Sequence, residues 1–242
     1  MGFTCKARPI SPYCFQSINI SGSTTYRRYL NMPFEIFNYQ KDLKNLLVTP
    51  QIRARFLKIA PGEVHDMHSH DLGHEIFLIL KGRLRFYIEG DEATVCEGEL
   101  CVATSDQIHQ VKNETNESVI MYLSVTPHIQ PTHTGREPDG SRHPTKFVES
   151  KMYDVDTDEI TPIDDLVDLL ETATKKIEAT SRTASSNLSS ISHELKTAIS
   201  LNKTDDADRI REIIWNDIRQ IHRDLYELSE LWNDLAPRAG SV

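Results

Sequence analysis

Apolar and polar residues alternate over short runs between residues 50 and 126. The alternation is clear where Ile52, Ala54 and Phe56 interleave with arginines, and residues 76–80 form a continuous apolar run after Glu75. A period of two is typical of strands with one buried face, and a short apolar run is typical of a fully buried strand. Further runs of this kind are expected to be strands at 84–88, 93–96, 99–103, 109–112 and 118–124. Because Gly, Asp and Asn separate the runs, the pattern predicts an all-β antiparallel sandwich or barrel.

The flanks of this region are less regular. Residues 34–47 fit either a short helix or a strand, and residues 127–160 are rich in Pro, Thr, His and Asp, which predicts an irregular segment. We expect residues 1–50 to form an arm that packs on the barrel, because that arm carries several aromatic side chains: Tyr26, Tyr29, Phe34 and Phe37.

From Thr161 onward the period becomes helical. Thr161 is placed to be an N-cap, Pro162 follows at the first helical position, and two aspartates lie in the first turn. Apolar residues then recur in steps of three and four as far as Ala198. The Ser- and Thr-rich stretch 180–192 has lower helix propensity, so the helix is expected to tolerate a break there.

A second helix is predicted from Thr204 to Pro237, again with one apolar face. Joined through 201–203, the two helices form a long antiparallel hairpin. Two helices alone cannot enclose both apolar faces, so a second copy of the hairpin is the simplest partner and a coiled-coil-like homodimer is expected. The predicted domains are thus an arm at 1–50, a barrel at 51–150 and a helical hairpin at 161–237.

Charge and cysteine usage narrow the functional classes. The chain has 27 Lys and Arg against 36 Asp and Glu among 242 residues. This acidic balance disfavours binding to nucleic acid or to an anionic membrane. No apolar run is long enough to span a bilayer, and no apolar signal segment opens the sequence. Four cysteines without a CxxC pair indicate reduced thiols, so a cytoplasmic protein is expected.

The strongest chemical signal is a group of histidines around one glutamate. His68 and His70 are two residues apart, so on a strand they point to the same face. Glu75 opens the apolar run that follows, and His109 lies on a later predicted strand. Three imidazoles and one carboxylate suit a divalent metal ion such as Fe, Mn, Ni, Co or Zn, without distinguishing among them.

The spacing of these residues resembles the first motif of the cupin superfamily. Gly62, five residues, His68, one residue, His70, four residues, Glu75, six residues and Gly82 meet every spacing of that motif. The resemblance covers roughly residues 50–126. It implies a double-stranded β-helix barrel with a metal inside, held by the three histidines and the glutamate.

The second cupin motif also has a match, with departures. Gly98, His109 and Asn113 follow its frame, whereas Thr104 and Asp106 stand where the family usually has Pro and Gly. Asp can still form a turn through its side chain. The resemblance therefore retains His109 as a ligand.

Several other side chains near the motifs have no assigned role. His65 and His74 are either alternative ligands, partners of the ligands or solvated, and solvation is the simplest reading. Alternation alone leaves it open whether Arg55, Arg85 and Tyr87 meet an anionic substrate or face solvent. His128 and His133 are placed to close the barrel mouth.

The hairpin carries a weaker resemblance. Residues 192–197, Ser-His-Glu-Leu-Lys-Thr, resemble the phosphoacceptor box of the dimerisation domain of sensor histidine kinases, with Ala198 where that box usually continues with Pro. The resemblance implies an exposed His193, oriented by Glu194, and a response regulator as partner. Because no ATP-binding domain follows in the sequence, self-phosphorylation is not expected.

These observations predict a metal-dependent cupin, an oxygenase- or lyase-type enzyme, dioxygenase-like, acting on a small organic substrate. The alternative is a metal- or metabolite-sensing barrel coupled to the hairpin, and a barrel for storage without turnover is a third reading. One barrel hosts many chemistries, so the sequence does not choose among them.

Overall fold

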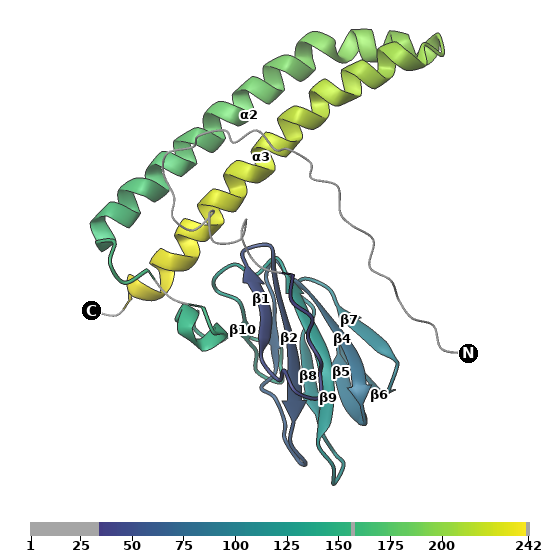
Figure 1. The fold of residues 1–242 in the computed structure, drawn as a ribbon, viewed down its shortest axis with the longest axis vertical. Helices are drawn as coiled ribbons and strands as arrows, with labels where there is room; N and C mark the ends of the chain where they lie inside the picture. Colours follow the sequence, from purple (N-terminus) through teal and green to yellow (C-terminus); the bar gives the residue numbers. More distant parts are fainter. Residues whose placement is uncertain (1–33, 156–157, 241–242) are drawn as a thin grey trace. The chain divides into compact units, whose positions relative to one another are not determined.

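The computed structural model describes residues 34–155 and 158–240. The barrel is built from ten strands in two antiparallel sheets (Figure 1). One sheet has the order β1-β2-β9-β4-β7, and its strands are β1 (Asn45–Thr49), β2 (Ile52–Ile59), β9 (Val119–Thr126), β4 (His74–Lys81) and β7 (Leu100–Ala103). The other has the order β10-β3-β8-β5-β6, and its strands are β10 (Thr134–Gly135), β3 (His68–Ser69), β8 (His109–Lys112), β5 (Arg83–Ile88) and β6 (Asp91–Cys96).

The prediction of an all-β antiparallel architecture is confirmed, as two five-stranded sheets. Alternating residues of both sheets fill the space between them and are almost fully buried. This core comprises Ile59, Phe77, Ile79, Leu84, Phe86, Val95, Ala103, Val111, Val119, Met121, Leu123 and Val125. Each large apolar side chain buried in this way contributes roughly 1.5–3 kcal/mol, so the apolar layer supports the polar site beside it.

Two glycines make the tight connections of this barrel. Gly82 joins β4 to β5 at φ +87°, and Gly90, at φ +91°, completes the turn between β5 and β6 after Glu89 at φ +51°. Consecutive positive φ angles are the geometry of a two-residue hairpin, so the turn predicted at Gly90-Asp91 is present, centred one residue earlier.

Residues 34–47 contain no helix. A turn at 39–41 leads into β1, which pairs with β2. Tyr39 packs edge-on against Phe56 of β2, whose ring contacts Tyr122 of β9. Phe34 is exposed, and Tyr26 and Tyr29, on which the arm prediction also relied, lie outside the described residues.

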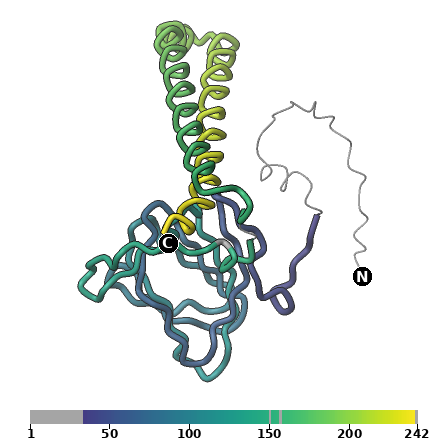
Figure 2. Tube along the Cα trace, turned by 90° about the vertical axis from the view of Figure 1, so that its left-hand side faces the viewer, coloured from purple at the N-terminus to yellow at the C-terminus, as the bar shows by residue number. Residues whose placement is uncertain are grey.

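The C-terminal region is a hairpin of two long helices, α2 (Ile163–Ser200) and α3 (Thr204–Arg238). Figure 2 shows them side by side along their length and joined at one end. Pro162 occupies the N-cap position, one residue later than predicted, while the Thr161 hydroxyl bonds to Asp158. No helix in the described part of the chain has the length and apolarity that crossing a membrane requires.

The break expected within 180–192 is absent, because α2 continues through this stretch. Its hydroxyls hydrogen-bond to carbonyls of the preceding turn, as Thr183 does to Ala179 and Ser189 to Ser185. The seam with α3 adds side-chain bonds, among them Thr180 to the buried Asp224 at 2.6 Å. Packing against the second helix thus outweighs the low intrinsic propensity.

Candidate metal centre

Both sheets contribute to the predicted site. His68 lies on β3 and pairs directly with His109 of β8, while Glu75 lies on β4 of the opposite sheet. His70 follows β3 by one residue. One ligand atom from each of the four side chains lies within 4.8 Å of every other.

Glu75 is the centre of this cluster. Its Oε2 lies 2.9 Å from Nε2 of His70, 2.9 Å from Nε2 of His109 and 3.8 Å from Nε2 of His68. His70, Glu75 and His109 are buried, and the His68 side chain is 15% exposed. The site is therefore buried at His70, Glu75 and His109, and a ligand from solvent would reach it past His68.

Backbone carbonyls fix the tautomer of each imidazole. Nδ1 of His68 bonds to the Asp66 carbonyl at 2.9 Å and Nδ1 of His109 bonds to the Gln107 carbonyl at 2.8 Å. Nδ1 of His70 bonds to the Thr132 carbonyl. A carbonyl only accepts, so each Nδ1 carries a proton, and each imidazole turns its Nε2 toward Glu75.

The electrostatics of Glu75 agree with a bound cation. Burial alone would raise its pKa, but the contacts with His109, His68 and His70 hold the pKa well below its usual value, so the carboxylate is charged. A buried carboxylate that faces three imidazole nitrogens needs either their protons or a cation among them to offset its burial. Nε2 of His68 is buried and lacks any hydrogen-bond partner among the described residues. These residues therefore fit a divalent metal ion.

The turn of the second motif keeps its shape despite the departures in sequence. Asp106 stands where the family usually has Gly and adopts φ +64°, a left-handed conformation that Asp tolerates better than most residues. Its amide donates to the His70 carbonyl at 2.8 Å. The turn thus connects the strand of one ligand to the loop of another.

Two arginines lie on the same sheet face as Glu75. The register pairs Glu75 with Val125, and Val125 with Arg53 of β2. In the next row, Phe77 pairs with Leu123, and Leu123 with Arg55. Directly opposed residues share a face, so both arginines point into the barrel.

Sequence reasoning left Arg55 open and missed Arg53. The available signal was their spacing of two residues on one strand. Arg85, by contrast, is on the outward parity of β5 and pairs with Glu92 at 2.7 Å. Tyr87 shares this outward parity, since the intervening Phe86 is in the core.

A second group of residues near the cluster belongs to the segment 127–133, here called the strap; its two histidines were named from the sequence, whereas the role of Thr132 was missed. The His133 ring lies 4.9 Å from that of His68 and 4.8 Å from that of His70, centroid to centroid. Burial, followed by the neighbouring histidines, holds the pKa of His133 well below its usual value, so it is neutral. Thr132 supports His70 through its carbonyl, and its hydroxyl bonds to Tyr153 at 2.6 Å.

The strap also contacts the hairpin. Trp232 of α3 donates to the Gln130 carbonyl at 2.6 Å, and Asn233 bonds to both the Gln130 amide and the His128 carbonyl. His128 is buried, and burial together with the charge of Arg53 lowers its pKa to about 3. Both strap histidines predicted at the barrel mouth therefore lie neutral near the site.

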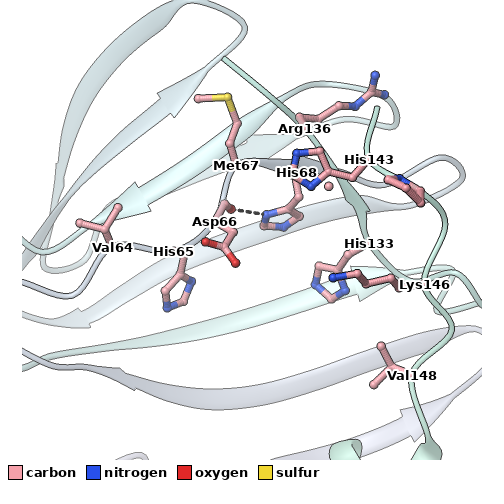
Figure 3. Close-up of a pocket in the computed structure, with 12 residues that line it drawn as sticks. Val64, His65, Asp66, Met67, His68, His133, Arg136, His143, Lys146 and Val148 are labelled. Atoms are coloured by element: carbon pink, nitrogen blue, oxygen red, sulfur yellow. Dashed lines mark hydrogen bonds between the residues drawn. The ribbon is translucent and has the colours of Figure 1, made fainter. Parts of the chain in front are cut away.

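A pocket of about 800 Å³ opens beside the cluster and reaches His68 and His133 (Figure 3). Arg136, His143 and Lys146 line it, with Asp66 as the acidic residue of the lining. Arg136 is held by the Ser69 hydroxyl through two hydrogen bonds. The pocket is an access route to the exposed side of His68.

The remaining predicted residues lie outside the cluster. His65 pairs with Glu63 at 3.1 Å, and His74 accepts a hydrogen bond from the Ser105 amide. In the hairpin His193 is exposed, as expected, but Glu194 bonds to Arg209 at 2.6 Å instead of orienting His193.

A comparison with known protein families agrees with the motif. The sequence profile of the family described as "Cupin domain" matches residues 55–126. An oxalate-binding protein from Thermotoga maritima is 29% identical over 69 residues, which are 28% of this chain and 56% of the relative. The chain thus spans little more than half the length of that curated relative.

Solved structures with a similar barrel include a conserved protein with a double-stranded β-helix domain from Klebsiella pneumoniae. It is 18% identical, with a TM-score of 0.40, and the match covers 43% of this chain and 99% of that one. A cupin superfamily protein from Desulfitobacterium hafniense is 15% identical, with a TM-score of 0.32, over 34% of this chain and 72% of that one. From the family match, both motif spacings and the two-sheet topology, we conclude that residues 55–126 form a cupin domain.

Proposed function

We propose that this chain is a metal-dependent cupin enzyme that transforms a small organic substrate bound at a single divalent metal ion inside the barrel. The observation that carries the proposal is the convergence of three imidazole side chains and one carboxylate, whose ligand atoms all lie within 4.8 Å of one another. Oxygenase- or lyase-type chemistry fits this donor set, because a six-coordinate metal with four protein ligands keeps two positions for substrate, water or oxygen.

In this proposal, different residues of the chain hold the metal, orient its ligands and admit the substrate. His68, His70, Glu75 and His109 would hold the metal, which would act as a Lewis acid or activate dioxygen. The carbonyls of Asp66, Gln107 and Thr132 keep the imidazoles in the ligating tautomer. The pocket admits the substrate past His68, and the buried apolar layer excludes water from the far side of the site.

Elemental analysis of the purified protein tests the metal site. We expect about one divalent ion per chain in the wild type and a large loss in His68→Ala. His65→Ala is the matched control, because His65 lines the same pocket but pairs with Glu63 outside the cluster. Substoichiometric metal in the wild type, or equal metal in His68→Ala and His65→Ala, would refute the proposal.

Turnover is a separate measurement. Oxygen uptake and product release are followed with a panel of small organic acids, using the metal-loaded wild type and His109→Ala. Turnover that depends on His109 supports an enzyme. A metal-loaded protein that turns over none of the panel favours sensing instead.

A sensor is the second candidate, because the strap bonds both to a metal-site histidine and to α3. The Thr132 carbonyl contacts His70, and Gln130, two residues earlier, contacts Trp232 and Asn233. In this alternative the state of the barrel is relayed through the hairpin and His193. Incubation with a phosphorylated response regulator tests it, and equal labelling of wild type and His193→Ala would end it.

A further inference from the structure

Unpaired buried donors gather around the metal cluster. Among the described residues, five buried side-chain atoms have no hydrogen-bond partner, and four of them surround this site: Arg53 Nε, Arg55 Nε, His68 Nε2 and His128 Nδ1. Buried polar groups are nearly always satisfied, so a group of orphans in one place indicates a missing ligand. A metal ion accounts for His68 but not for the two guanidinium groups, which are donors only.

Arg53 is already partly engaged. Its guanidinium lies over the Tyr153 ring, 4.9 Å from the centroid, and its side chain is 2% exposed. Burial lowers its pKa, while Tyr153 and Glu75 act in the opposite direction. Arg53 therefore has a fixed position, and its Nε–H is unpaired.

Arg55 is the less compensated of the two. No ion pair to its guanidinium occurs in the described part of the chain, and burial together with the charge of Arg53 lowers its pKa to about 10. The two guanidinium groups outnumber Glu75, the one carboxylate on their sheet face near the site. A divalent cation beside Glu75 would enlarge this positive surplus, which is costly in a barrel interior unless an anion enters.

We propose that Arg53 and Arg55 form an anion shelf beside the metal centre, and that the substrate is a small carboxylate whose oxygen atoms reach both the metal and the Arg55 guanidinium. This inference rests on the proposed function and names its substrate class. The planar guanidinium matches a carboxylate in a two-point contact, which a neutral isostere cannot reproduce. Arg136 and Lys146 line the access pocket and attract an anion from solvent.

Calorimetric titration of metal-loaded protein with oxalate, and with its neutral diamide oxamide, tests the shelf. We expect wild type to bind oxalate and not oxamide. Arg55→Gln should weaken oxalate binding about 10- to 100-fold, the usual effect of a hydrogen bond to a charged group, with the metal content unchanged. Arg85→Gln is the matched control, because Arg85 is a strand arginine that faces outward and pairs with Glu92.

The outcomes of this titration distinguish a failure of the anion shelf from a failure of the metal site. Equal oxalate affinity in Arg55→Gln and wild type, or equal affinity for oxamide and oxalate, overturns the shelf while leaving the metal site intact. If the wild type carries no metal, the proposed function fails. In that case the anion shelf still predicts that the metal-free protein binds oxalate, more weakly, and that Arg55→Gln weakens this binding further. If Arg55→Gln does not fold, as judged by circular dichroism, Arg55→Lys replaces it, and undiminished oxalate affinity in that variant overturns the two-point contact.

Discussion

At the scale of single residues, backbone atoms support the metal-site imidazoles. The partners of Nδ1 are the carbonyls of Asp66, Gln107 and Thr132, so no side-chain substitution at those positions removes the accepting atom itself. The ligating tautomer is thus a property of the local backbone path. The carboxylate of Glu75 supplies the negative charge that the imidazoles lack.

Glu75→Gln separates charge from shape at this position. The amide keeps the size of the side chain but cannot carry the negative charge, so we expect divalent-metal affinity to fall by at least about tenfold. Its NH₂ group can donate to a bare Nε2, so the metal-free variant should melt near the metal-free wild type. Competition against a chelator measures affinity, and unchanged affinity would show that Glu75 does not contact the ion.

The sequence was sufficient to predict that these four side chains lie together, and insufficient to predict their surroundings. His68, His70 and Glu75 lie within eight residues, and His109 lies in a second local motif, so spacing alone connects them. Arg53 reaches the site only through the register of β2 on β9 and of β9 on β4. His133 was named from the sequence for the barrel mouth, but its position beside the His68 and His70 rings depends on the path of an irregular segment without any period.

At the scale of elements, the β4–β5 turn depends on Gly82. An alanine there would retain the φ of +87° and place its Cβ 3.1 Å from Val119 Cγ2, whereas a Cβ at Gly62, with φ +74°, would meet nothing within 4 Å. Left-handed backbone costs a non-glycine residue about 1–2 kcal/mol.

Gly82→Ala and Gly62→Ala therefore form a matched pair. Both should lower the free energy of unfolding by about 1–2 kcal/mol through backbone conformation. Gly82→Ala should lose more, because Val119 must also shift. Urea denaturation measures the difference, and equal losses in the two variants would show that Val119 yields without cost.

The C-terminal part of α3 contains a glutamate, Glu230, whose pKa is raised. Burial raises the pKa of Glu230 from its ordinary 4.5 to about 7, with Asp234 and Glu227 adding repulsion. Between these pH values the folded chain binds more protons than the unfolded chain, so its stability falls as the pH rises through that interval.

Glu230→Gln removes this dependence. The variant should resemble the wild type below pH 4.5 and become the more stable of the two above pH 7, since the amide has no charge to desolvate. Thermal melts from pH 4 to pH 8 give the comparison. A wild-type advantage at high pH would mean that the ionised carboxylate has a favourable partner.

Element types were largely predictable, because strand periodicity and helix periodicity are local. The two-residue strands β3 and β10 were not, since they exist only through pairing with β8 and with each other. The sequence left open a break in α2 for a related reason: its Ser-rich middle is stabilised by a helix that follows it in the sequence. Non-local pairing overrides propensity in both cases.

At the scale of the whole molecule, the hairpin has an exposed apolar flank. Val167, Leu188 and Ile199 of α2 lie within about a quarter of the helix circumference, and so do Trp215, Ile218 and Leu225 of α3. All six are between 41% and 61% exposed. In each helix, viewed from its N-terminus, these residues are rotated in the same direction away from the face that contacts the other helix. Because the two helices are antiparallel, the two sets of residues lie on one side of the hairpin.

Homodimerisation through this flank stays a prediction, and Leu188→Glu tests it. We expect the wild type to sediment at about twice 27.7 kDa and Leu188→Glu to shift toward the monomer. Leu169→Glu is the control, because Leu169 is 46% exposed, as Leu188 is 49%, but lies on the opposite flank. A monomeric wild type, or the same shift in both variants, would contradict this interface.

The strap has a consequence for any ligand of the helices. The Thr132 carbonyl accepts the hydrogen bond from Nδ1 of His70. Two residues earlier in the strap, Gln130 is hydrogen-bonded to Trp232 and Asn233 of α3. If the barrel binds a metal ion as proposed, thermodynamic reciprocity applies: an effector that moves the strap by tilting the helices changes the affinity for that ion, and binding of the ion changes the effector's affinity by the same factor.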